Sequence, residues 1–242
     1  MKIIADTHTH SLACDHAYST IEENLNAAAK AGLKILCSTE HTPDMPGAPS
    51  HIYFNNLRVL PRYTEGVMLV RGAEVNVLDD RGGLDLTEHE LEKLEWVIAS
   101  MHMTNFHPKS KAECTNAWLA IAENPRVHVI GHCGDERYAF DYEPVLREFA
   151  RAGKIVEINS HSFSVRPGSK ENCLKIARLC MELGIPVVVS SDAHHHSFVG
   201  RFDAALTMLE ELGFPEELIL NAEYSRFLDV LHRLNGGALS GE

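Results

Sequence analysis

Histidine and acidic side chains gather near both ends of this 242-residue chain. Within eleven positions, the segment after the first apolar run carries four of them: Asp6, His8, His10 and His16. Asp192 and His194 follow a late run of valines with the spacing of two that also separates His8 from His10. Residues two apart in an extended segment point the same way, and imidazole with carboxylate suits borderline divalent ions. The chemistry to be expected is therefore that of a metal site.

Further candidates follow other apolar runs, so that nine ligands can be proposed: His8, His10, His16, His41, Glu74, His102, His132, Asp192 and His194. A catalytic ion takes about three protein ligands and keeps one position open. Nine ligands therefore favour three ions over one, with Zn²⁺, Mn²⁺ or Fe²⁺ as the ions that accept such a set. Asp6 is either a further ligand or a group that orients a ligating imidazole.

Seven short, β-branched runs predict the strands that position these residues: 2–5, 34–38, 67–72, 96–100, 127–131, 154–158 and 186–190. Helical patterns lie between and after them: 52–63, 112–123, 143–152, 170–183, and near 202–212 and 223–234. The first helix is expected to begin at a capping box. In that box Ser19 is the N-cap and Glu22 returns to its backbone N–H, and the helix ends at Gly32.

This alternation predicts an α/β fold with parallel strands and right-handed crossovers. Seven units favour a closed or nearly closed TIM-like barrel, whose chemistry collects at the C-terminal ends of the strands. No GxGxxG follows a strand, so the dinucleotide fingerprint is absent. Since neither a linker nor a low-complexity stretch interrupts the pattern, we expect a single domain over 1–242.

The composition narrows the class of partner. The formal net charge is −12 and the basic residues are dispersed, which excludes the basic patch of a nucleic-acid binder. No apolar run approaches the roughly 20 residues of a membrane span, and nothing resembles a signal peptide. The six cysteines form no CxxC pair, so we expect reduced, mostly buried thiols and a cytoplasmic protein. The oligomeric state stays open.

These residues stand in motifs that resemble the PHP family, named for polymerase and histidinol phosphatase domains, and most closely its YcdX-type phosphatase branch. The motifs are DTHTH (6–10), HAYST (16–20), EHTPDMPGAP (40–49), RGAE (71–74), GHCGD (131–135), EINSHSF (157–163), GSKENC (168–173) and SSDAH (190–194). The resemblance covers essentially the whole chain and implies a distorted (β/α)7 barrel. The chain departs from the family at Glu40, usually Asp, and at Cys133, usually Pro.

The resemblance also implies how the ligands are shared. It assigns one metal to His8, His10, Glu74 and Asp192, a second to Glu74, His102 and His132 with Glu74 bridging, and a third to His16, His41 and His194. The implied activity is hydrolysis of small-molecule phosphomonoesters at a trinuclear centre of divalent ions, with zinc foremost and manganese or iron as alternatives. Two of the ions would share a bridging hydroxide as nucleophile. Glu74, Asp192 and His194 are the expected catalytic residues.

Arg166 and His161 are candidates for holding the phosphate, since both follow the sixth predicted strand. Three alternatives stay open: a histidinol-phosphate phosphatase, an amidohydrolase-like enzyme acting on C–N or lactone bonds, and a metal-binding barrel without activity. Amidohydrolases typically carry a carboxylated lysine after a middle strand. The corresponding strand ends here carry Glu74, His102 and His132 instead.

Overall fold

The computed structural model describes residues 1–108, 110–239 and 241. Its centre is one sheet of eight strands, in the order β1-β2-β4-β5-β6-β7-β8, with β3 paired on β4. The parallel strands are β1 (Ala5–Thr9), β2 (Ile35–Ser38), β4 (Val67–Asn76), β5 (Trp96–Ser100), β6 (Val129–Ile130), β7 (Ile155–Asn159) and β8 (Val187–Ser190). The short β3 (Tyr63–Thr64) runs antiparallel to the start of β4.

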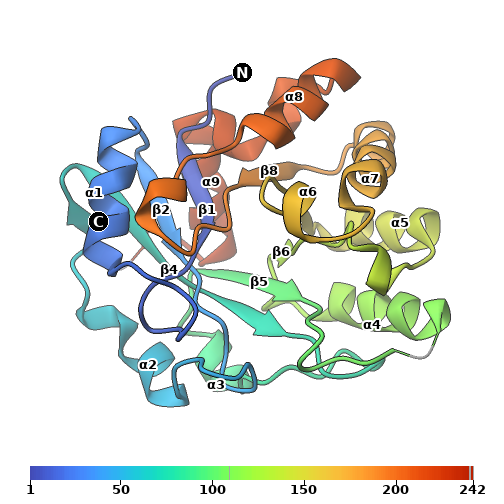
Figure 1. Cartoon of the computed structure of the whole chain (residues 1–242), viewed down its shortest axis with the longest axis horizontal. Helices are drawn as coiled ribbons and strands as arrows, with labels where there is room; N and C mark the ends of the chain where they lie inside the picture. The colour runs from blue at the N-terminus through green and yellow to red at the C-terminus, as the bar shows by residue number, and fades with distance from the viewer. Residues whose placement is uncertain (109, 240, 242) are drawn as a thin grey trace.

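The sheet curves until its two outer strands meet (Figure 1). An isolated parallel bridge links Thr9 to Ala193, and the N–H of His10 donates to the carbonyl of Ala193 at 2.9 Å. Beside it, Asp6 accepts a hydrogen bond from the N–H of Ser191 at 3.1 Å. The seven parallel strands thus form a nearly closed barrel, which confirms the expected α/β fold.

Helices surround the barrel (Figure 1). They are α1 (Ile21–Lys30), α2 (His51–Asn56), α3 (Glu88–Leu91), α4 (Lys111–Glu123), α5 (Tyr142–Ala152), α6 (Ser162–Val165), α7 (Ser169–Leu183), α8 (Asp203–Leu212) and α9 (Tyr224–Leu234). Short 3-10 helices are η1 (Leu57–Val59), η2 (Glu136–Tyr138), η3 (His196–Phe198), η4 (Glu216–Leu218) and η5 (Leu220–Ala222). Within the described part of the chain, none of the helices has the length and apolar character that crossing a bilayer demands.

The core has two parts. The larger lies between the helices and the outer face of the barrel. The smaller fills the barrel itself, where side chains from the beginnings of the strands, such as Ile35 and Trp96, pack with Phe227 and Leu231 of α9. Because α9 covers this end, the opposite end, where the strands finish, is left for the polar residues.

Several predicted boundaries are wrong for a common reason. The first strand is residues 5–9, and the third continues to residue 76. Asp6, His8 and Glu74 therefore lie inside strands and not after them. In an apolar-run pattern a strand ends at its first polar residue. These polar side chains nevertheless lie within the strands and are buried, because other polar groups contact them there.

Two predicted helix boundaries also need correction. The capping box of α1 is Thr20 with Glu23, one residue after the predicted pair. Ser19 is buried and instead accepts a hydrogen bond from the N–H of His196 at 2.8 Å. The helix predicted over 52–63 ends as α2 and η1, because Leu60 precedes Pro61 and takes the extended conformation that proline imposes on its predecessor.

Candidate metal centre

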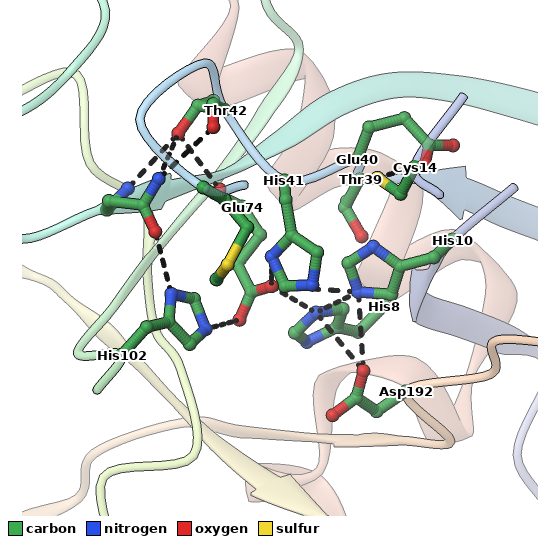
Figure 2. Close-up of polar contacts among 12 residues, drawn as sticks. His8, His10, Cys14, Thr39, Glu40, His41, Thr42, Glu74, His102 and Asp192 are labelled. Carbon is green, nitrogen blue, oxygen red and sulfur yellow. Dashed lines mark hydrogen bonds and ion pairs between the residues drawn. The ribbon is translucent and has the colours of Figure 1, made fainter. Parts of the chain in front are cut away.

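The carboxylate of Glu74 lies at the middle of a buried histidine cluster (Figure 2). Ring nitrogens of five imidazoles come within 3.6 Å of its oxygens: His41 and His132 at 2.8 Å, His102 at 3.3 Å, His8 at 3.4 Å and His10 at 3.6 Å. Glu74 is 1% exposed. These residues come from β1, β4 and the segments after β1, β2, β5 and β6, so the barrel gathers them from 125 positions of sequence.

Asp192 is the second carboxylate of the cluster and follows β8. Its Oδ1 lies 3.3 Å from His10 Nε2 and 3.7 Å from His8 Nε2. His194 turns back so that its Nδ1 lies 3.0 Å from the carbonyl of Asp192, and its ring is 4.3 Å from the ring of His10, centre to centre. His8 in β1 and His10 directly after it therefore lie between the two carboxylates.

The donor atoms of the cluster fit a metal better than they fit one another. Glu74 Oε2, His10 Nδ1, His41 Nδ1 and His102 Nε2 are buried without a hydrogen bond of acceptable geometry to any described residue. Yet His41 Nδ1 and Glu74 Oε2 are only 2.8 Å apart. Two atoms that lie this close without forming a hydrogen bond can both bind one ion placed beside them. Buried orphan atoms of this kind indicate a missing ion, and the nitrogen and oxygen set suits a borderline divalent cation.

Three sets of donor atoms in this cluster lie within 4.8 Å of one another: His8, His10 and Glu74; His41, Glu74 and His102; and His10, His41 and His194. Glu74 belongs to two of these sets, as a bridging carboxylate would. A further set joins His10 to Cys14 and Glu40. Glu40 is occupied by its own loop, because it accepts hydrogen bonds from the N–H of Ser11 at 3.0 Å and from Cys14 Sγ at 3.2 Å.

Electrostatics favour ionised carboxylates and a neutral ligand among the imidazoles. Burial alone would raise the pKa of Glu74, but His8, His102 and His41 outweigh it and hold that pKa well below its usual range. Burial would likewise raise the pKa of Asp192, but the neighbouring His8 and Arg166 outweigh it and hold that pKa well below its usual range. Burial lowers the pKa of His102 to about 4. Metal ligation needs neutral imidazole and charged carboxylate, and the two carboxylates and His102 are already in these states. Glu157, Glu74 and Asp192 outweigh burial and raise the pKa of His8, so His8 would have to release a proton when a cation binds.

Glu157 in β7 orients His8, and the sequence analysis missed it. Its Oε1 lies 2.6 Å from His8 Nδ1, which turns His8 Nε2 toward the cluster. The same carboxylate accepts hydrogen bonds from Ser190 Oγ and from the N–H of His132, both at 2.7 Å. A carboxylate that fixes a ligating histidine is a recurrent feature of metal sites. The available signal was a glutamate inside the apolar run 154–158.

Asn76 plays the corresponding part for His102. Its Oδ1 lies 2.7 Å from His102 Nδ1, which leaves Nε2 facing Glu74. Asn76 is itself held, since its amide donates to Asp85 Oδ2 at 2.6 Å and to Thr42 Oγ1 at 3.1 Å. Thr42 belongs to the motif over residues 40–49, whereas Asp85 comes from a loop that no sequence pattern connected to the site.

The backbone of β1 is adjusted to bring His8 and His10 into the barrel. The register of β1 on β2 shifts by one residue, with the pairs Ala5–Ile35, Asp6–Leu36 and Thr9–Ser38. Ala5 belongs to the inner core, so strict alternation would turn His8 outward. The extra residue reverses the alternation, and bulges of this kind re-aim side chains beside active sites.

Two site residues also hold uncommon backbone angles. His132 has φ +25° and Asp192 has φ +54°, and Glu65 is the one other non-glycine residue with positive φ in the described chain. Side chains with a Cβ reach this region at a cost of about 1–3 kcal/mol. Both residues sit at the point where a strand ends and the chain must turn over the barrel, so the surrounding hydrogen bonds maintain the strain where the site requires it.

The remaining predicted residues are placed less centrally. The His16 side chain is 43% exposed, and its ring stacks 5.0 Å from the rings of His41 and His194. Asp6 does not enter the cluster but binds the loop after β8, since it accepts hydrogen bonds from Ser191 and from the N–H of Gly200 at 2.9 Å. Burial raises the pKa of Asp6 to about 6.

Of the two candidates for phosphate binding, one borders the cluster. Arg166 Nη1 and Nη2 lie 3.1 Å and 3.2 Å from Asp192 Oδ2, and the side chain is 14% exposed. His161 lies at the beginning of α6, half-buried, with its ring 6.4 Å from that of Phe198. Within the described residues it makes no contact with the histidine cluster.

The six cysteines are free and buried, as expected. Cys133 lies among them, and its pKa is raised by burial and by the neighbouring Cys173 and Cys180. The thiol therefore belongs to the core, and it is absent from the groups of donor atoms described above.

The chain matches the model of the PHP domain over residues 6–161 and that of the PHP-associated region over residues 170–222. A protein of Thermoanaerobacter sp. (strain X514), named a probable phosphatase, is 46% identical over 233 residues, which cover 96% of this chain and 95% of that protein. A probable phosphatase of Aliivibrio fischeri (strain MJ11) is 43% identical over 233 residues, which cover 96% of this chain and 94% of that protein.

Solved structures share the fold. A histidinol phosphate phosphatase of Lactococcus lactis, crystallised with zinc, L-histidinol and phosphate, superposes with a TM-score of 0.63 over 89% of this chain and 95% of that one, at 18% identity. A chain of an archaeal ribonuclease P bound to mature tRNA superposes with a TM-score of 0.56 over 96% of this chain and 90% of that one, at 11% identity. At these identities the likeness concerns the fold.

Proposed function

The chain belongs to the PHP domain family, and on that premise we propose that it is a metal-dependent phosphatase of small-molecule phosphomonoesters. The observation that carries the proposal is the position of Glu74, buried between five imidazoles with one of its oxygens unpartnered. Relatives that align over nearly their whole length are named probable phosphatases, which supports the reaction class.

We assign three divalent ions to the cluster. His8, His10, Glu74 and Asp192 would hold the first; Glu74, His102 and His132 the second; and His16, His41 and His194 the third. Glu74 between its imidazoles supports the sharing of one carboxylate by two ions. The exposure of His16 makes the third group the most accessible to substrate. Zinc is the first candidate because imidazole dominates the set, with manganese and iron as alternatives.

Bound ions would polarise the phosphoryl group and acidify a water to serve as nucleophile. The chain's own residues prepare the site for that chemistry. Glu157 and Asn76 hold two imidazoles so that Nε2 faces the cluster. Arg166, beside Asp192 and still partly exposed, has the planar donors to bind a phosphoryl oxygen, with His161 on the same segment as a second candidate. Glu74, Asp192 and His194 remain the residues to which we assign catalysis.

The proposed substrate is small and phosphorylated. A net charge of −12 and dispersed basic residues disfavour a polynucleotide. Histidinol phosphate belongs to the same chemical class, so a histidinol-phosphate phosphatase is a special case to be resolved by assay. An amidohydrolase-like reaction on C–N or lactone bonds is disfavoured, because the middle strand ends that would carry a carboxylated lysine carry Glu74, His102 and His132 instead.

Metal analysis and one substitution test the proposal. We expect about three ions per chain in protein purified without added metal, and turnover of a panel of phosphomonoesters that includes histidinol phosphate. Glu74→Gln should lower both the metal content and kcat/KM, the latter at least about 100-fold, because the residues of the centre act as a unit. Glu143→Gln, on an exposed side chain of α5, is the matched control. Activity on amides or lactones alone, or full turnover by Glu74→Gln, would contradict the proposal.

A further inference from the structure

A cavity of about 560 Å³ lies on the outside of the barrel wall. We call it the outer cavity; Phe54, Leu57, Arg58, Arg71, Lys93 and Glu95 line it. It lies between the α2–η1 segment and the chain between α3 and β5, and Figure 1 shows α2 and α3 as neighbours. Arg71 precedes Glu74 by three positions in β4, so the two side chains point to opposite faces of the sheet. The outer cavity is therefore separate from the histidine cluster.

Arg71 is the buried cation of the outer cavity. The residue is 7% exposed. Its Nη2 donates to the carbonyl of Leu60 at 2.9 Å, and its Nη1 lies 3.7 Å from Glu95 Oε1. Its Nε has no hydrogen-bond partner among the described residues. Leaving a donor of a buried charged group without an acceptor is costly, so a ligand that supplies an acceptor to Arg71 Nε is to be expected.

Among the residues that the structure describes, Glu95 is the only carboxylate lining the outer cavity, and it already has partners. Glu95 binds Arg62 through two hydrogen bonds, from Nη1 to Oε2 at 2.8 Å and from Nη2 to Oε1 at 2.5 Å. Glu95 Oε2 also accepts the backbone N–H of Arg71 at 2.9 Å. Glu95 is thus hydrogen-bonded to Arg62 and to the backbone of Arg71, while its contact with the Arg71 guanidinium is the longer one, at 3.7 Å.

Two further cations stand at the opening of the outer cavity. Lys93 and Arg58 are exposed, and the Nζ of Lys93 donates to the side-chain oxygen of Asn55. Together with Arg71 they place three cationic side chains in the lining against one carboxylate, Glu95, in a protein whose net charge is −12. Such a surplus matches a dianion better than a singly charged carboxylate, and arginine donors fit phosphate oxygens.

We propose that the outer cavity binds a phosphate dianion, with Arg71 as its buried anchor and Lys93 and Arg58 at its entrance. Phe54 and Leu57 form an apolar wall beside these donors, so the phosphate is expected to belong to a small organic molecule. The inference rests on residues outside the metal centre and holds whether or not the proposed phosphatase activity is correct.

The test follows the side-chain Nε–H signal of Arg71 by NMR in the metal-loaded protein, assigned through its loss in Arg71→Lys. Inorganic phosphate and phenylphosphonate, which a phosphatase cannot hydrolyse, are the two probes. We expect a saturable shift of this signal, with phenylphosphonate binding about tenfold more tightly, since that corresponds to about 1.4 kcal/mol from the apolar wall. Equal affinities would support free phosphate as the ligand.

Variants locate the binding site. Lys93→Ala and Arg58→Ala change exposed residues and should each raise the dissociation constant for phenylphosphonate, about tenfold for Lys93→Ala. Arg147→Ala on α5, also exposed and remote in sequence, should leave it unchanged. Glu74→Gln should not affect the Arg71 shift, because the signal reports the outer cavity alone. No saturable shift with either probe at about tens of millimolar, in a protein that gives the Arg71 signal, would overturn the proposal.

Discussion

At the scale of single residues, Glu157 decides how His8 is presented. Its carboxylate is 1% exposed and joins three strand ends, through His8, Ser190 and the N–H of His132. Burial alone would raise the pKa of Glu157, but His8 outweighs burial and lowers it. Glu157 therefore acts as a charged acceptor that positions ligands without entering the cluster.

Replacing Glu157 by glutamine keeps the size of the side chain and removes its charge. We expect Glu157→Gln to weaken metal binding by about 10–100-fold, since the partner that orients a ligating histidine is lost. Chelator competition measures the affinity, and thermal unfolding of the apo-protein measures any general loss of stability. Glu217→Gln changes an exposed glutamate and serves as control. An unchanged metal affinity would assign Glu157 a structural role only.

His128 makes the stability of the fold depend on pH. Burial, with Lys154 and Arg126 nearby, lowers the pKa of His128 to about 4. Its Nδ1 accepts the N–H of Val97 at 3.1 Å, which requires the neutral ring. In the unfolded chain the imidazole of His128 has a pKa near 6.5, so it binds a proton at pH values where the folded protein keeps it neutral. The stabilisation is therefore complete above pH 6.5 and is lost as the pH falls toward 4.

Between pH 7 and pH 5 this histidine alone should cost the wild type about 2 kcal/mol of unfolding free energy. His128→Gln retains an acceptor for Val97 and lacks the titration, so its urea-unfolding free energy should fall less over the same interval by about that amount. His89→Gln, at an exposed position, should follow the wild type. Identical pH profiles for wild type and His128→Gln would show that His128 is not the responsible group.

At the scale of elements, turns and caps place the ends of strands and helices. The extra residue in β1 brings His8, and His10 directly after the strand, into the barrel. The capping box of α1 then fixes where the chain leaves the site, because Thr20 Oγ1 accepts the N–H of Glu23 at 3.1 Å and Glu23 Oε2 accepts the N–H of Thr20 at 2.7 Å. Ser19 is thereby free to bind the segment after β8.

Thr20→Ala should lower the free energy of unfolding by about 1 kcal/mol, as is typical for the loss of an N-cap. Urea denaturation monitored by circular dichroism measures the change. Thr207→Ala removes an exposed threonine in the middle of α8 and should not destabilise the protein, because alanine has the higher helix propensity. A Thr20→Ala protein as stable as the wild type would mean that Thr20 does not cap α1 in solution.

At the scale of the whole molecule, the larger, outer part of the core joins the regions matched by the two family models. The outer core contains residues from Ile3 to Ile219, and the inner core reaches Leu239. We propose that residues 1–242 unfold as one domain. The metal centre lies where strands from both regions end, so bound ions should stabilise all of it together.

Calorimetry should therefore show a single transition whose calorimetric and van't Hoff enthalpies agree. Removing the metal with a chelator should lower Tm by about 5–10 °C, which is the shift expected for an ion bound at about 100 times its dissociation constant. Added zinc or manganese should restore it. Two separate transitions would contradict the single domain, whereas a Tm insensitive to chelation would contradict the metal centre.

The order of strands and helices, and the residue types at the strand ends, were readable before any folding was considered. Apolar runs and histidine spacing depend on neighbours in sequence, so the barrel and its candidate ligands follow from them. The convergence of those ligands, the contact of Glu157 with His8, and the reversed alternation in β1 depend on packing between segments up to 184 residues apart. No local pattern encodes such contacts, because a buried charge is tolerated only where distant partners surround it.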